Sequence, residues 1–186
     1  NRAGAGGQLG FEALAQAEAD GYTIGFINTP NVLTIPIERA ARFHWTQYEL
    51  LGNILDDPGG FSVHRDSEIK SLDDLARYAK ANPNRVTVGT TGVGSDDHLA
   101  MLAFERLAGV KMVHVPFAGA APVRAALEGR HIDVGAVNIG EAKQHTESGS
   151  PFRNLGQMSQ RRVAIALDVP TFKELGYDME MASLRG

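Results

Sequence analysis

The chain has 186 residues, of which 43% are hydrophobic and 22% charged, and its formal net charge is −4. This composition is typical of a globular protein with a hydrophobic core, and its mixed charges exclude a basic surface for nucleic acid. The absence of cysteine excludes disulfides, thiolate nucleophiles and cysteine-bound zinc. No apolar run reaches the ~20 residues of a membrane span, so we expect no direct membrane insertion. Residues 1–4 do not begin like a signal peptide.

The first 55 residues predict only about one βα unit and one further strand, which is too little for an independent core. Periodicity and turn residues place the elements as follows: a helix over 9–20, a buried strand over 22–27, a polar turn at Asn28–Asn31, some helix after Pro36 and a strand over 48–55.

The segment Asp56–Gly60 is the strongest cluster of turn-forming residues in the chain. We therefore expect it to be a hinge between two lobes, with a second crossing near residues 178–184. On this interpretation, residues 1–58 and 181–186 form a partial first lobe, and residues 59–180 form the second lobe.

From residue 61 to about 149, predicted strands alternate with predicted helices. This order is typical of an α/β sheet with mostly parallel strands. A weak strand over 155–159, a short helix over 168–176 and an extended segment over 177–182 follow. The strands are expected over 61–64, 86–88, 111–115 and 132–137, and the helices over 72–81, 99–107, 120–128 and 139–149.

The stretch Gly89–Leu99 joins a strand to a helix through three glycines and several hydroxyl groups. The first N–H groups of a helix have no partner inside the helix, and the helix dipole favours negative charge there. Glycines let the backbone approach a ligand closely. We therefore expect an anion site, although glycine and serine are also ordinary connector residues.

Two further polar loops, 116–122 and 138–141, also follow predicted strands, and parallel strands bring such loops to one edge of a sheet. The loop at 28–31 belongs to the first lobe and is expected to face them. Since no loop carries Lys or Arg at its core, backbone N–H groups, hydroxyls and an amide are the expected donors. The predicted ligand-binding residues are Thr29, Thr90, Thr91, Gly94, Ser95, His98, Gly119, Ala120 and Asn138.

A hydrolase is an alternative interpretation, with Ser95 as nucleophile and His98 as base. Spacing of three residues at a helix start is poor geometry for this pair, and no orienting acid is evident. Asp96, Asp97 and His98 would be a weak metal cluster, since acidic residues are expected in a first helical turn. We therefore expect no metal, no cofactor and no catalysis.

The assembled motifs resemble one family closely, the periplasmic solute receptors of the tripartite tricarboxylate transporters, also called the Bug receptors. The resemblance covers nearly the whole chain, and it is carried by the order and spacing of Asn1–Gly7, Asp20–Thr23, Ser71–Leu75, Ala79–Pro83, Gly89–Leu99, His114–Gly119, Leu127–Asp133, Asp168–Thr171 and Glu174–Gly176.

This resemblance implies a periplasmic-binding-protein fold of type II with two lobes that close on a small carboxylated solute. It also implies a periplasmic location and delivery of the solute to the membrane components of a permease. By comparison with the family, the sequence lacks a first strand, loop and helix and the C-terminal helices, so we expect a chain truncated at both ends. The effector-sensing domain of a transcription regulator shares this general fold and remains an alternative.

Five positions, at three places in the chain, depart from the family pattern. Asp96 and Asp97 stand where small or hydroxyl residues are common, and two carboxylates beside an anion site would weaken it unless they point away. Phe117-Ala118 replaces a Tyr-Lys pair, and Asn138 stands where an aspartate is common. An amide both donates and accepts without charge, so this last change alters which groups of a ligand are tolerated.

Overall fold

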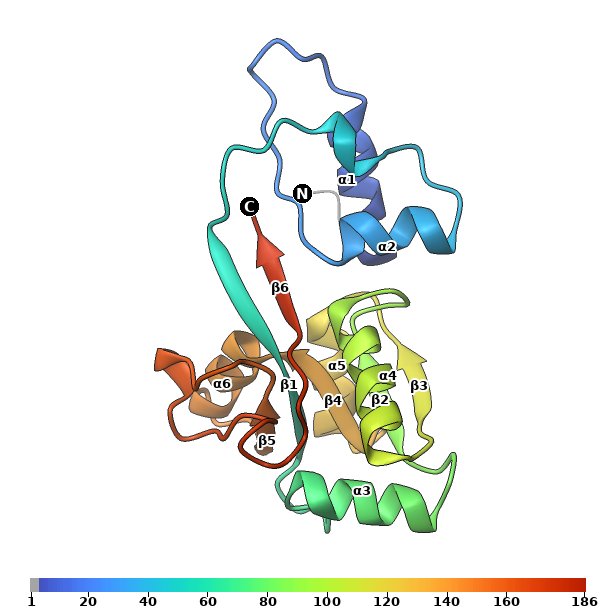
Figure 1. The fold of residues 1–186 in the computed structure, drawn as a ribbon, viewed down its shortest axis with the longest axis vertical. Helices are drawn as coiled ribbons and strands as arrows, with labels where there is room; N and C mark the ends of the chain where they lie inside the picture. The colour runs from blue at the N-terminus through green and yellow to red at the C-terminus, as the bar shows by residue number, and fades with distance from the viewer. Residues whose placement is uncertain (1–3) are drawn as a thin grey trace.

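The computed structural model describes residues 4–186, and the first three residues of the Asn1–Gly7 motif lie outside them. Figure 1 shows a sheet with helices around it at one end of the molecule and two helices, α1 and α2, set apart at the other end. The helices are α1 (Gln8–Ala15), α2 (Asn31–Glu38), α3 (Leu72–Ala81), α4 (Asp96–Ala108), α5 (Ala120–Glu128) and α6 (Ile139–Glu147).

Six strands form the sheet, in the order β3-β2-β4-β1-β5, with β6 paired to β1. Strand β1 runs antiparallel to β4, β5 and β6, while β2 is parallel to β3 and β4. Five strands therefore point the same way and β1 alone is reversed, so the expected α/β class is confirmed. The strands are β1 (Leu55–His64), β2 (Thr87–Thr90), β3 (Val113–Pro116), β4 (Val134–Asn138), β5 (Phe152–Gln157) and β6 (Ala182–Arg185).

Serine side chains fix the starts of two helices. The Ser71 hydroxyl accepts a hydrogen bond from the N–H of Asp74 at 3.1 Å, and the Ser95 hydroxyl accepts one from the N–H of His98 at 3.2 Å. Each serine hydroxyl thus accepts a hydrogen bond from a backbone N–H group that the helix itself leaves unpaired. Helix α4 ends at Gly109, whose φ of 65° suits glycine.

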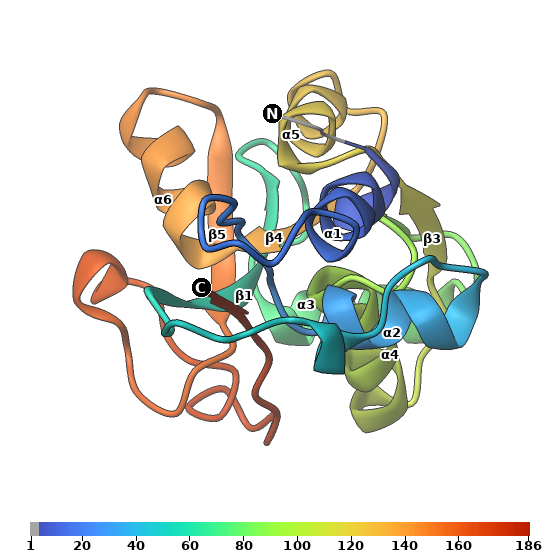
Figure 2. The same cartoon turned by 90° about the horizontal axis from the view of Figure 1, so that it is seen from above.

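Helices cover both faces of the sheet, because successive side chains of β4 point to opposite faces and each face is apolar. Val134 and Ala136 belong to the core that includes α3 and α4, whereas Val137 belongs to the core that includes α5 and α6. Seen from above, α5 and α6 lie toward one side of the sheet and α4 lies toward the other (Figure 2).

Three aromatic rings form the centre of the larger core. Phe61 is fully buried, and its ring meets those of Phe104 at 5.6 Å and Phe172 at 5.3 Å, both edge to face. A separate and smaller core joins α1 to α2, with Phe11 and Phe43 in edge contact at 5.4 Å.

Two predicted strands near the N-terminus are wrong. Residues 22–27 are extended but mostly exposed, with Tyr22 93% and Ile24 79% exposed, and only Ile27 exchanges backbone hydrogen bonds, with Gly186. Residues 48–54 are likewise outside any strand. An apolar run becomes a strand only when a neighbouring strand pairs with it, and here β6 and Gly186 pair with residues 27–29 but not with residues 22–26 or 48–53.

The segment Asp56–Gly60 lies inside β1 and does not form a turn. Its first half pairs with β6 and its second half pairs with β4 and β5. Glycine suits this place, since a Cβ on Gly60 would lie 3.1 Å from the Gly156 oxygen. The segment is thus where one strand changes neighbours, and turn-forming residues were a misleading signal.

Two helix predictions also need correction. No helix forms over residues 168–176, where only residues 172–176 form a continuous turn. Helix α2 begins at Asn31 with Pro36 inside it, where we expected a turn and only then a helix. Proline is favoured in the first turn of a helix, and this preference placed the expected start after Pro36, whereas Pro36 is the sixth of the eight residues of α2. In the part of the chain that the structure describes, no helix has the length and apolar character needed to cross a membrane.

Replacing Phe61 with alanine is expected to lower the free energy of unfolding by about 3–5 kcal/mol, because it removes a fully buried ring from a packed aromatic cluster. Leu107→Ala, at a half-exposed position on α4, is the matched control and is expected to change stability by less than ~1 kcal/mol. Urea unfolding measures both. Equal losses in the two variants would contradict this account of the core.

Candidate functional site

A cleft of about 830 Å³ separates α1, α2 and the extended segment between them from the end of the sheet. Figure 1 shows these two helices facing the sheet end, with β1 and β6 running up beside them. The far wall consists of the β2–α4 loop, the loop before α5, the β4–α6 junction and the end of β6. The cleft is large enough for a small organic solute.

Four of the nine predicted ligand-binding residues line this cleft: Thr91, Gly119, Ala120 and Asn138. They come from three different strand-to-helix junctions, as expected for loops at one edge of a sheet. The remaining five, namely Thr29, Thr90, Gly94, Ser95 and His98, are not among the lining residues.

Those five residues instead shape the loops around the cleft. Thr90 Oγ1 lies 2.6 Å from His114 Nε2, and the Ser95 hydroxyl donates to the Gly92 oxygen at 2.8 Å. The Gly94 N–H donates to His98 Nδ1 at 3.2 Å, and Thr29 Oγ1 accepts from the Leu184 N–H at 3.2 Å. Their hydroxyl and imidazole groups are thus engaged with the protein itself.

The rings of His98 and His114 stack behind the glycine-rich loop, with centroids 4.0 Å apart and planes 10° from parallel. Burial, together with the neighbouring His98, lowers the pKa of His114 to about 4. Burial also lowers the pKa of His98. Both rings are therefore neutral at pH 7, which lets His98 Nδ1 accept the N–H of Gly94.

The helices α1 and α5, whose N-cap residues are Gly7 and Gly119, begin at the cleft without a side-chain cap. The Asn138 side chain likewise does not cap α6, but the N–H of Gly140 in the first turn of α6 donates to Asp57 Oδ1 at 3.2 Å. In contrast, Ser71 and Ser95 cap α3 and α4. Uncapped helix starts that open on a cleft present N–H donors and positive partial charge to a ligand.

Arg185, near the end of β6, is a cleft residue that the sequence prediction missed. Its Nη2 donates to Asn138 Oδ1 at 2.6 Å and lies 3.6 Å from Asp57 Oδ2, and its Nε donates to Ser183 Oγ at 3.2 Å. Of the lining residues between 4 and 186, it is the only Lys or Arg. No local sequence motif predicts that Arg185 lies at the cleft, because its position depends on the pairing of β6 with β1.

The amide of Asn138 fixes this arginine and two other groups. Its Nδ2 donates to the Asp57 carbonyl and to Asp96 Oδ2, both at 2.8 Å, while its Oδ1 accepts from Arg185. The side chain is 3% exposed, so each of these bonds lies out of water. An aspartate could not donate to the Asp57 carbonyl in the same way.

Four carboxyl groups gather beside the cleft, and burial raises the pKa of each. Asp96 and Glu141 line it, and Asp57 and Asp97 lie behind them. The pKa of Asp97 is raised most strongly, because burial raises it and repulsion from the neighbouring Asp96 carboxylate raises it further. Asp97 Oδ2 accepts hydrogen bonds from the hydroxyl and N–H of Thr91, at 2.6 and 3.3 Å.

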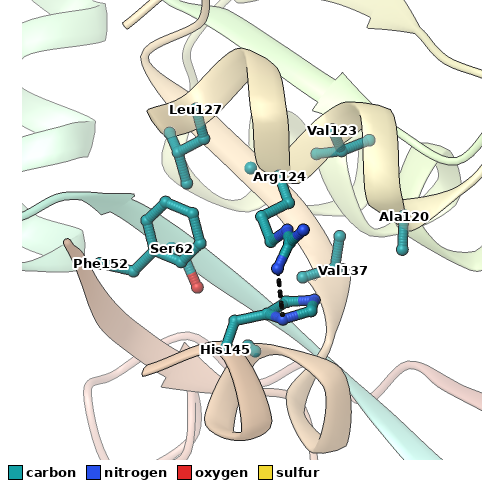
Figure 3. A pocket seen from close by; sticks show the side chains of 10 residues that line it. Ser62, Ala120, Val123, Arg124, Leu127, Val137, His145 and Phe152 are labelled. Carbon is teal, nitrogen blue, oxygen red and sulfur yellow. Dashed lines mark hydrogen bonds between the residues drawn. The ribbon is translucent and has the colours of Figure 1, made fainter. Parts of the chain in front are cut away.

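The geometry does not support nucleophilic catalysis by Ser95. The residue is fully buried, and its hydroxyl both donates to Gly92 and caps α4. No group of three or more metal-binding side chains occurs between residues 4 and 186. A second cavity, between α5, β4 and α6, has a volume of about 10 Å³, room for one water molecule, with Arg124 facing His145 across it (Figure 3).

The model of the tripartite tricarboxylate transporter family receptor matches residues 1–186, the whole chain. The chain belongs to this family. The expected resemblance is thus confirmed, and the family is one of solute receptors.

Two curated proteins are similar to this chain. The UPF0065 protein in the gbd 5' region of Cupriavidus necator is 31% identical over 98% of the chain and 55% of its own length. BugT of Bordetella pertussis is 30% identical over 98% of the chain and 57% of its own length. The chain therefore spans about half the length of the curated relatives it matches.

Solved structures show the same fold. The periplasmic binding protein BugD matches all of this chain and 62% of its own, with a TM-score of 0.89 and 28% identity. R. palustris Rpa4515, solved with adipate, matches all of this chain and 62% of its own, with a TM-score of 0.92 and 26% identity. The receptor fold of periplasmic binding proteins, as expected from the sequence, is confirmed.

Replacing Asp97 with asparagine is expected to remove a pH-dependent loss of stability. A carboxyl whose pKa is raised in the folded state stabilises that state at low pH, and this contribution disappears as pH rises above the ordinary aspartate pKa and through the raised one. Asp96 and Glu141 face the same group and add repulsion once they are ionised. The asparagine oxygen keeps the bonds from Thr91.

Denaturant unfolding of the wild type and the Asp97→Asn variant at pH 5 and pH 8 measures this effect. The stability of the variant relative to the wild type should increase from pH 5 to pH 8. Asp168→Asn, at an exposed ion pair with Lys143, is the control and should show no such increase. A difference between Asp97→Asn and wild type that is the same at both pH values would contradict the assignment.

Proposed function

We propose that this chain forms the ligand-binding part of an extracytoplasmic receptor that captures a small carboxylate-containing solute between two lobes. The observation that carries the proposal is the cleft of about 830 Å³ that is lined by the uncapped N-termini of α1 and α5 and by Arg185. A carboxylate binds well to such donors because each N–H pairs with an oxygen and the helix dipoles favour the charge.

The relatives support this choice of ligand class. Rpa4515, at 26% identity, was solved with adipate, a dicarboxylate, and BugD is named a periplasmic binding protein. By the same family membership, we place the receptor in the periplasm and have it deliver its solute to membrane permease components. In this role the receptor binds its solute without chemical change.

The lobe division follows from the same proposal. Residues 1–58 and 181–186 belong to a first lobe that is incomplete here, and residues 59–180 form the second. Strand β1 passes between them at Asp56–Gly60, where its neighbour changes from β6 to β4 and β5. Rotation there and near residues 178–184 closes the cleft over the solute.

Adding a carboxylate that fits the cleft to the full-length protein should raise its melting temperature. At a ligand concentration 100 times Kd the stabilisation is about 2.7 kcal/mol, which shifts Tm by several degrees. A thermal-shift screen of mono-, di- and tricarboxylates, with adipate included, measures it. If no member of a broad set raises Tm, the proposal is wrong.

Gly119→Ala should weaken carboxylate binding about tenfold, because φ at Gly119 is 112° and a side chain forces the start of α5 to move. Gly149→Ala is the matched control: its φ is 90°, a Cβ at either glycine meets no atom within 4 Å, and Gly149 does not line the cleft. Calorimetry should find an altered Kd for Gly119→Ala alone. The same Kd change in both variants would exclude α5 as a carboxylate donor.

A further inference from the structure

One hydrogen bond joins the two proposed lobes at a place away from the strands that connect them. The Thr34 hydroxyl on α2 donates to the carbonyl of Gly94, in the loop before α4, at 2.6 Å. In Figure 1, α2 faces this loop, and β1 and β6 lie to the left of the contact. Within residues 4–186, no other hydrogen bond joins residues 4–54 to residues 59–180.

Gly94 allows this contact because it has no side chain. Its φ is 79°, and a Cβ there would lie 3.0 Å from Glu38 Oε2 and 3.2 Å from Thr34 Oγ1. Helix α2 therefore packs directly against the backbone of the loop. Gly94 is buried, so its carbonyl depends on the Thr34 hydroxyl for a hydrogen-bond partner.

The loop that receives this bond is fixed from within. The Ser95 hydroxyl donates to the Gly92 carbonyl at 2.8 Å, and the Gly94 N–H donates to His98 Nδ1 at 3.2 Å. Both polar groups of the Gly94 backbone are thus bonded, one to α4 and one to α2. Because the loop holds its carbonyl in one direction, the bond from Thr34 forms only when α2 lies against the loop.

The two elements that this bond joins also line the cleft. Asn31, the first residue of α2, and Thr91, at the start of the loop, are lining residues, whereas Thr34 and Gly94 are not. Thr34 lies three residues beyond Asn31 on the same helix. A bond that holds α2 against the loop therefore keeps two walls of the cleft together without touching a solute between them.

We infer that Thr34 is a positioning residue that latches the two lobes together and thereby slows the release of a bound solute. This inference rests on the proposed function, because it concerns closure of the same cleft. Opening the cleft breaks the bond and returns the Gly94 carbonyl to water, so the hydroxyl stabilises the closed form alone. Since the solute leaves from the open form, the latch acts mainly on the dissociation rate.

Stopped-flow binding measurements on the full-length protein test the inference, with adipate, succinate and citrate as probes. Thr34→Val removes the hydroxyl and keeps the shape of the side chain. For each probe that binds, this variant should raise koff about three- to tenfold, the effect of one lost hydrogen bond, and change kon less than about twofold. Thr34→Ser retains the hydroxyl and should release the probe at the wild-type rate.

Thr146→Val is the matched control. Both threonines are half-buried in helices and donate to the carbonyl four residues earlier, Thr34 to Pro30 at 3.2 Å and Thr146 to Ala142 at 2.9 Å. Of the two, only Thr34 also bonds to the other lobe, and neither lines the cleft. Thr146→Val loses the same kind of helical bond and should keep the wild-type koff.

A second measurement detects the latch without any solute. Spin labels attached through Glu18→Cys and Arg106→Cys, in a background without other cysteines, lie at exposed positions on the first and second lobes, outside the cleft. Pulsed electron resonance measures the distance between them. Thr34→Val should enlarge the population with longer distances, whereas Thr34→Ser should give the wild-type distribution.

The outcomes separate this inference from the proposed function. If a probe binds and Thr34→Val releases it at the wild-type rate, or if Thr146→Val releases it as fast as Thr34→Val, the latch is wrong and the receptor function stands. If no carboxylate binds, the proposed function fails, and the label distances decide the latch by themselves. An unchanged distance distribution in Thr34→Val contradicts the latch in either case.

Discussion

The side chain of Asn138 holds together three parts of the molecule that are distant in the sequence. It reaches the backbone of β1 at Asp57, the first turn of α4 at Asp96 and the end of β6 at Arg185. Because the amide is buried, each of its bonds would be costly to lose without a replacement. The position of the cleft wall depends on this one group, since its arginine and one of its acids are both bound to it.

Strand β1 has a similar role in the architecture. It is the one reversed strand in the sheet, and it is long enough to pair with β4 and β5 at one end and with β6 at the other. In the proposed closure of the cleft, β1 is the connection that bends where it changes neighbours. The glycines at 59 and 60 allow close backbone packing at this change.

The sequence determined most of the second half of the chain. The alternation of strands and helices from residue 61, the serine cap of α3, and the junctions at 89–98, 116–122 and 138–141 all follow from local patterns and turn chemistry. Its motifs, in their order and spacing, also indicated the family. It placed Thr91, Gly119, Ala120 and Asn138 at the cleft, because parallel strands bring such junctions to one edge.

The tertiary structure alone decided the rest. Whether residues 22–27 and 48–54 become strands depends on a pairing neighbour, and whether Asp56–Gly60 turns or runs straight depends on β4, β5 and β6. Arg185 reaches the cleft only because β6 pairs with β1, across more than a hundred residues of sequence. The charge balance of the cleft is likewise a sum over Asp57, Asp96, Asp97, Glu141 and Arg185. Local patterns report neighbours along the chain, whereas pairing and electrostatics depend on neighbours in space.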